Sequence, residues 1–92
     1  MSTVNTVLGP VETANLGFTL SHEHVGTNAA GLRHTYPEII DRAGVIEQST
    51  AAMQEVYIAG VRTIVDVTTI DLGRDIEMIQ EVSRASGIQI IA

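Results

Sequence analysis

The chain has 92 residues, the size of one small domain or of part of a larger one, and its 45% hydrophobic and 17% charged residues exclude a disordered chain. It contains no cysteine, which excludes disulfides, cysteine-based zinc fingers and a cysteine nucleophile. The net charge is -6 and all five basic residues are arginine, so a basic nucleic-acid groove, a polybasic membrane contact and lysine chemistry are also excluded.

The amino-terminal third predicts a short hairpin or extended arm, a strand and a loop. Residues 3–8 alternate weakly and reach a turn signal at Gly9-Pro10. Residues 18–22 alternate with a period of two, which is typical of a strand. Residues 25–37 are rich in Gly, Ala, Asn and Thr and predict a long loop. A loop of this kind after a strand is often functional.

A helix and a buried strand are expected next. Residues 41–59 follow the helical period, and Gly60 stands where such a helix would end. Residues 61–67 form a β-branched run that suits a strand covered on both faces of a parallel sheet. The helix is expected to direct one face inward, formed by Ile46, Ser49 or Thr50, Met53, Val56 and Tyr57.

The remaining residues repeat this helix-strand unit. A loop over 68–73 leads into a helix over 74–86, which Gly87 ends, and residues 88–92 predict a third strand. The inner face of this helix is expected to consist of Ile76, Ile79, Val82 and Ser83.

The order β-α-β-α-β implies right-handed crossovers between parallel strands. Three parallel strands alone leave two open edges and one uncovered face, which is unfavourable for an independent domain. We therefore expect residues 1–92 to be a segment of a larger α/β protein, either truncated, engineered or one polypeptide of a nicked enzyme.

The string Ser21-His22-Glu23-His24 is the strongest chemical signal. Residues i and i+2 of a strand project to the same side, roughly 7 Å apart at Cα, so both imidazoles could reach one metal ion. The alternative is two partly buried polar residues without a ligand. A position at the carboxyl end of a parallel strand favours the metal site, because α/β barrels place reactive groups there.

Other polar residues have simpler interpretations. His34 is expected to be a solvated loop residue. Asp66 interrupts an apolar strand, and we favour a structural hydrogen-bond hub over an acceptor for a ligating histidine. In the next loop, Asp71 is expected to cap the helix, Gly73 to permit a tight turn and Arg74 to pair with an acid.

Three stretches together resemble the phosphotriesterase family of the amidohydrolase superfamily. They are Leu8-Gly9-Pro10 with Leu16 to His24, Ala59 to Thr68, and Asp71-Leu72-Gly73-Arg74-Asp75. Tyr36-Pro37-Glu38 also resembles an element of the family's first loop. The resemblance implies the first β-α-β-α-β portion of a (β/α)8 TIM barrel, preceded by the hairpin or arm.

The same resemblance implies a binuclear metal centre, usually zinc, whose bridging hydroxide hydrolyses phosphotriesters or lactones. His22 and His24 match the family's first-strand metal ligands, and Leu72 matches a position that lines the substrate pocket. The family's carboxylated lysine, further histidines and catalytic aspartate come from later strands that are missing here. The isolated chain is therefore expected to bind metal weakly and to be inactive.

Two alternatives stay open at this point. The chain could be a noncatalytic structural fragment that forms a homo-oligomer or complements the remainder of the barrel. It could also belong to an enzyme of another branch of the superfamily. A membrane span and a basic secretory leader are not apparent, which favours a cytoplasmic location. Export stays open, because a leader could have been removed.

Overall fold

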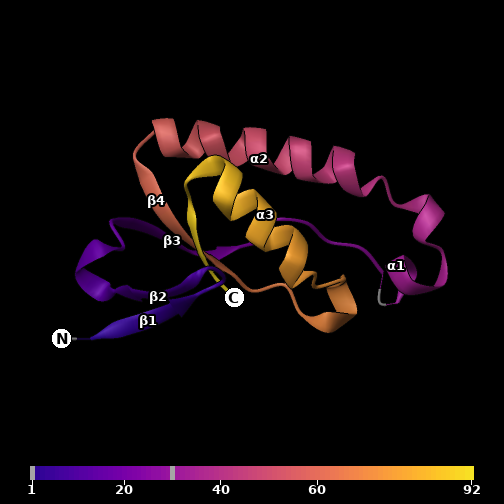
Figure 1. Cartoon of the computed structure of the whole chain (residues 1–92), viewed down its shortest axis with the longest axis horizontal. Helices are drawn as coiled ribbons and strands as arrows, with labels where there is room; N and C mark the ends of the chain where they lie inside the picture. Colours follow the sequence, from indigo (N-terminus) through magenta and orange to yellow (C-terminus); the bar gives the residue numbers. More distant parts are fainter. Residues whose placement is uncertain (1, 30) are drawn as a thin grey trace.

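The computed structural model describes residues 2–29 and 31–92 and is of mixed α/β type. A parallel sheet of order β3-β4-β5 forms its centre, with strands β3 (Phe18–Glu23), β4 (Val61–Asp66) and β5 (Gln89–Ile91). The two long helices lie on the same side of this sheet (Figure 1). The predicted order of three parallel strands with helical crossovers is therefore confirmed.

Helix α2 (Arg42–Ile58) connects β3 to β4, and α3 (Ile76–Ser86) connects β4 to β5. Helix α3 begins later than predicted because Asp75 is its N-cap, with the carboxylate accepting a hydrogen bond from the Met78 amide. Asp41 caps α2 in the same way. None of the helices in the two described ranges is long and apolar enough to cross a bilayer.

An antiparallel hairpin precedes the sheet, as one of the two sequence interpretations predicted. It pairs β1 (Thr3–Thr6) with β2 (Gly9–Glu12). Gly9-Pro10 begins the second strand and does not form the turn, so this detail of the prediction was wrong. The Val7 amide in the turn donates a hydrogen bond to the Ile90 carbonyl at 2.8 Å, which attaches the hairpin to the middle of β5. The hairpin and the sheet are both visible in Figure 1.

The predicted loop over residues 25–37 contains a short helix that the sequence did not indicate. Gly31 has a φ of +74° and turns the chain into the single turn of α1 (Leu32–Thr35). Pro37 then starts a 3-10 turn, because a proline at the first helical position loses no hydrogen bond. The 3-10 turns are η1 (Thr13–Asn15), η2 (Pro37–Ile39) and η3 (Ile70–Leu72).

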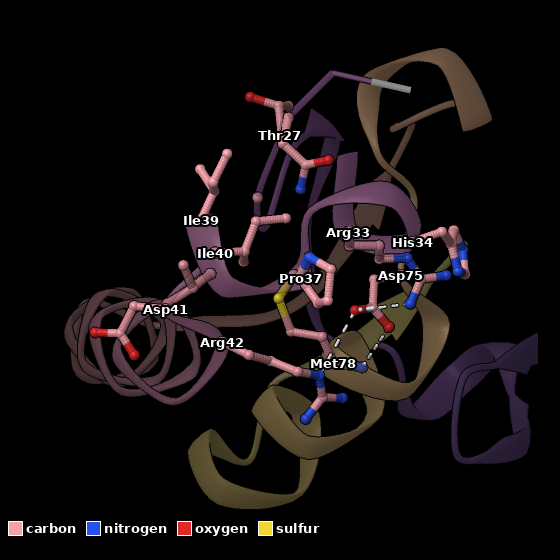
Figure 2. A pocket seen from close by; sticks show the side chains of 13 residues that line it. Thr27, Arg33, His34, Pro37, Ile39, Ile40, Asp41, Arg42, Asp75 and Met78 are labelled. Carbon is pink, nitrogen blue, oxygen red and sulfur yellow. Dashed lines mark hydrogen bonds and ion pairs between the residues drawn. The ribbon is translucent and has the colours of Figure 1, made fainter. Parts of the chain in front are cut away.

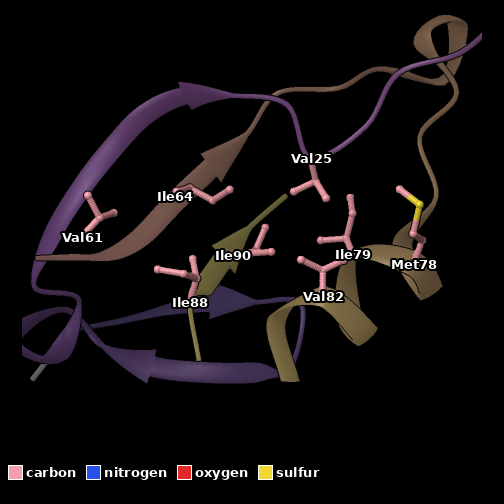
Figure 3. Close-up of a cluster of buried hydrophobic side chains, with 8 residues drawn as sticks. All are labelled: Val25, Val61, Ile64, Met78, Ile79, Val82, Ile88 and Ile90. Atoms are coloured by element: carbon pink, nitrogen blue, oxygen red, sulfur yellow. The ribbon is translucent and has the colours of Figure 1, made fainter. Parts of the chain in front are cut away.

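The buried core lies between the sheet and α3 (Figure 3). Ile76 was predicted to face inward but is 36% exposed, because α3 turns Met78 into the core instead. Tyr57 of α2 was also predicted to face inward but is 38% exposed, and its ring packs under the Arg62 guanidinium at 3.8 Å. The core consists of Val25, Val61, Ile64, Met78, Ile79, Val82, Ile88 and Ile90.

Gly73 makes the tight turn that the sequence predicted, with a φ of +82°. A Cβ atom at this position would overlap the Asn28 side-chain amide. Two constraints therefore select glycine here, namely a left-handed backbone and close approach of the loop that follows β3.

Gly73→Ala is expected to destabilise the chain more than Gly87→Ala. Both glycines have nearly the same positive φ, +82° and +81°, so both variants carry the left-handed cost of about 1–2 kcal/mol. Only the Gly73 variant also collides with Asn28, since a Cβ at Gly87 would meet Tyr57 at an ordinary 3.5 Å. Urea unfolding measures the difference, and equal losses for the two variants would contradict the steric argument.

Candidate functional site

The two histidines that the sequence singles out lie side by side at the carboxyl end of β3. His22 belongs to the strand, His24 follows it directly, and both residues are exposed. Their ring centroids are 5.7 Å apart and the ring planes meet at 78°. The predicted proximity of the two imidazoles is therefore confirmed, while the binding of a metal ion by them remains a prediction.

A bulge in β3 determines which face carries the histidines. Leu20 and Glu23 are three residues apart, but their partners Ile64 and Asp66 in β4 are only two apart. Leu20 packs against the core, and unbroken alternation would place His22 on that same apolar face. The extra residue reverses the alternation, so the uninterrupted pattern predicted for this strand was wrong. His22 consequently leaves the side of Leu20.

Asp66 joins the ends of β3 and β4. Its side chain is almost fully buried, with the residue 4% exposed. One carboxylate oxygen accepts a hydrogen bond from the Val25 amide at 2.9 Å, and the other accepts from the Thr68 amide at 2.8 Å. These two charge-assisted bonds offset the cost of burying the carboxylate. The prediction that Asp66 is a structural hydrogen-bond hub is confirmed.

Thr68 is a contact of His24 that sequence reasoning missed. Its Oγ1 lies 2.8 Å from His24 Nδ1, and the residue is only 1% exposed. The contact joins residues 44 positions apart, and it exists because β3 and β4 are neighbours. The one available signal was the place of Thr68 directly after the second predicted strand, at the same end of the sheet as the histidines.

No third ligand joins the two histidines within residues 2–29 and 31–92, where no group of three His, Cys, Asp or Glu side chains could hold a metal. His34 lies in α1, is exposed and borders a different part of the surface. Its interpretation as a solvated residue agrees with this placement. The described residues therefore supply a pair of nitrogen ligands and not a complete coordination shell.

Leu72 lies in η3, in the loop that follows β4, and is 41% exposed. Its backbone carbonyl accepts a hydrogen bond from the Asn28 amide at 2.8 Å. The loops that follow β3 and β4 are thus connected at this residue. A role for the Leu72 side chain in lining a substrate pocket remains a prediction.

A separate pocket of about 410 Å³ lies beside these loops (Figure 2). It is bordered by the loop after β3 and by the first turns of α2 and α3, and neither His22 nor His24 lines it. Its walls are largely apolar, with Asp75 and two arginines at one side (Figure 2). The other lining residues are Gly26, Thr27, Asn28, His34, Pro37, Ile39, Ile40, Asp41, Val45 and Met78.

Asp75 organises the polar side of this pocket. Its Oδ2 lies 3.1 Å from Arg33 Nη1 and 3.8 Å from Arg42 Nε, while Oδ1 caps α3 (Figure 2). The expectation that Asp71 caps this helix was wrong, because Asp71 lies in η3 and accepts from the Thr69 hydroxyl. Arg74 makes no ion pair with any residue in the described parts of the chain, contrary to expectation.

Comparison with known proteins gives one consistent result. Residues 2–92 match the model of the phosphotriesterase family. A phosphotriesterase homology protein of Mycobacterium tuberculosis is 40% identical over 99% of this chain and 28% of its own length. An aryldialkylphosphatase of Saccharolobus solfataricus is 33% identical over 89% of this chain and 26% of its own length.

A solved structure of a mutant organophosphorus hydrolase from Deinococcus radiodurans is similar over 98% of this chain and 27% of that one. The TM-score is 0.85 and the sequence identity is 35%. The chain thus spans roughly a quarter of the length of the proteins it matches.

Asp75→Ala is expected to destabilise the chain more than Asp41→Ala. Each substitution removes an N-cap, which costs about 1 kcal/mol. Asp75 is buried and also holds two arginines, so its loss should cost about 2–4 kcal/mol. Asp75→Asn keeps a capping oxygen and should fall between them. Chemical denaturation of the three variants tests this order, and an Asp75→Ala loss no larger than that of Asp41→Ala would contradict it.

Proposed function

The chain belongs to the phosphotriesterase family, and from this premise we propose that residues 1–92 form the amino-terminal part of a single (β/α)8 barrel domain of a metal-dependent hydrolase. Three parallel strands joined by two helices on one side of the sheet support this proposal. The close similarity to about a quarter of the organophosphorus hydrolase structure supports it independently.

The observation that carries the proposal is the pair of neighbouring, exposed imidazoles at the carboxyl end of the first parallel strand. Neutral imidazole is a preferred ligand of zinc, and a tetrahedral site needs further ligands beyond two. The donor set of His22 and His24 therefore fits one part of a zinc site. Ligands from other strands of a complete barrel would supply the rest of a binuclear centre.

In the complete protein, bound divalent metal would activate water and polarise the scissile bond of the substrate. His22 and His24 would hold one ion at the mouth of the barrel. Leu72 would contribute an apolar wall to the substrate site from the adjacent loop. The substrate class is a phosphotriester or a lactone, since relatives named for each activity, an aryldialkylphosphatase and a phospho-furanose lactonase, are similar to this chain.

The isolated chain is expected to bind Zn²⁺ weakly through His22 and His24, because it provides only two ligands. Titration against a chromogenic zinc indicator should show His22→Ala and His24→Ala each abolishing this binding. His34→Ala is the matched control, since His34 is exposed but lies apart from the pair. Undiminished zinc binding in the double variant His22→Ala/His24→Ala would contradict the assignment.

A chimeric enzyme tests the hydrolytic part of the proposal. This chain would replace the matching quarter of the Saccharolobus aryldialkylphosphatase, and hydrolysis of an aryl dialkyl phosphate would be measured with zinc. We expect turnover by the chimera and none by the 92-residue chain alone. His22→Ala and His24→Ala should each lower kcat by more than tenfold, because each removes a metal ligand, while His34→Ala should not.

Circular dichroism and light scattering establish that each chimeric variant is folded and soluble before its activity is compared. A folded chimera with His22→Ala and His24→Ala that still retains full turnover would contradict the assigned role of the histidines.

A second candidate is a noncatalytic fragment that associates with copies of itself or with the remainder of a barrel. The observation in its favour is the exposure of large apolar side chains, with Phe18 at 66% and Ile58 at 85%. Strand β3 also has no strand partner on its outer edge among the described residues. Light scattering with and without zinc separates the two candidates. A folded oligomer whose size does not change with zinc favours the noncatalytic fragment.

A further inference from the structure

The contact between His24 and Thr68 bears on whether His24 can bind a cation at all. The distance from Nδ1 to Oγ1 is 2.8 Å, which is a hydrogen bond. Thr68 is 1% exposed, and its backbone amide is bound to Asp66 Oδ1 at 2.8 Å. The backbone of Val25, next to His24, is bound to the other oxygen of the same carboxylate. Both partners of the contact are thus anchored to one buried group.

A neutral imidazole carries one proton, so the hydrogen bond can run in two directions. If the Thr68 hydroxyl donates to Nδ1, the proton of His24 is on Nε2 and neither ring nitrogen has a free lone pair. If Nδ1–H donates to Thr68 Oγ1, the lone pair of Nε2 is free. Only the second arrangement makes His24 a metal ligand beside His22.

We propose that Thr68 is a positioning residue whose hydroxyl oxygen accepts a hydrogen bond from His24 Nδ1–H and thereby presents Nε2 of His24 as a ligand. This inference rests on the proposed function, because it assigns a supporting residue to the metal site proposed for His22 and His24. A threonine hydroxyl has two acceptor lone pairs, and ligating histidines almost always donate their other ring N–H to a fixed acceptor. Here the acceptor comes from β4 and the ligand from β3.

The arrangement also fixes the orientation of the ring. His24 is exposed, and an exposed imidazole without a partner would rotate freely about its side-chain bonds. The bond to a buried hydroxyl restrains this rotation and keeps the ring 5.7 Å from that of His22. Removing the hydroxyl should therefore weaken metal binding without removing any ligand.

Nitrogen and carbon NMR of the histidine rings tests the proposal directly on the metal-free 92-residue chain at about pH 8, where free imidazoles are neutral. We expect His24 to be the Nδ1–H tautomer. In Thr68→Val, which is nearly isosteric, both neutral tautomers of His24 should be populated, and Zn²⁺ affinity should fall by about 10–100-fold. Thr68→Ser keeps the hydroxyl and should retain both the tautomer and the affinity.

Thr69→Val is the matched control, because Thr69 is exposed and its hydroxyl contacts Asp71 and not His24. The backbone amide spectrum reports whether each variant is folded. If Thr68→Val does not fold, the tautomer of His24 in the unmodified chain still decides the proposal. An Nε2–H tautomer in the unmodified chain, with zinc binding intact, would overturn the role of Thr68 and leave the proposed function standing. An Nδ1–H His24 in a chain that binds no zinc would support the hydrogen-bond direction and contradict the metal site.

Discussion

The carboxylate of Asp66 is buried at the end of β4, where burial without partners would be strongly unfavourable. Its two oxygens accept the amides of Val25 and Thr68, which follow the ends of β3 and β4. Hydrogen bonds to a charged acceptor contribute about 1.5–3 kcal/mol each. The bond from Val25 joins the two strand ends, whereas the bond from Thr68 is local and fixes the turn that follows β4.

The bulge in β3 decides which face of the strand carries the two histidines. It allows Leu20 to pack against the core while His22 and His24, two and four positions later, lie on the opposite, exposed face. A regular strand could not do both, because its side chains alternate strictly. The bulge thus separates the part of the strand that stabilises the sheet from the part that can bind a ligand.

The loops beyond the strand ends are connected by their own contacts. The backbone N–H of Asn28 donates to the Leu72 carbonyl, and Gly73 leaves room for the Asn28 side chain. Asp75 adds ion pairs from the start of α3 to Arg33 and Arg42. These contacts hold the loop after β3 against the loop after β4 and shape a pocket that is distinct from the histidine pair.

The amino-acid sequence determined the order of strands and helices, because hydrophobic periodicity and the glycines that end helices are local properties. It also identified His22 and His24, since their spacing is visible without a fold, and the role of Asp66, because a carboxylate in an apolar strand needs partners. The sequence did not predict the short helix α1, the burial of Met78 or the cap at Asp75, since each depends on how neighbouring elements pack. Only the tertiary structure revealed the bulge that turns the histidines away from the face of Leu20 and the contact with Thr68, because both arise from the pairing of strands distant in sequence.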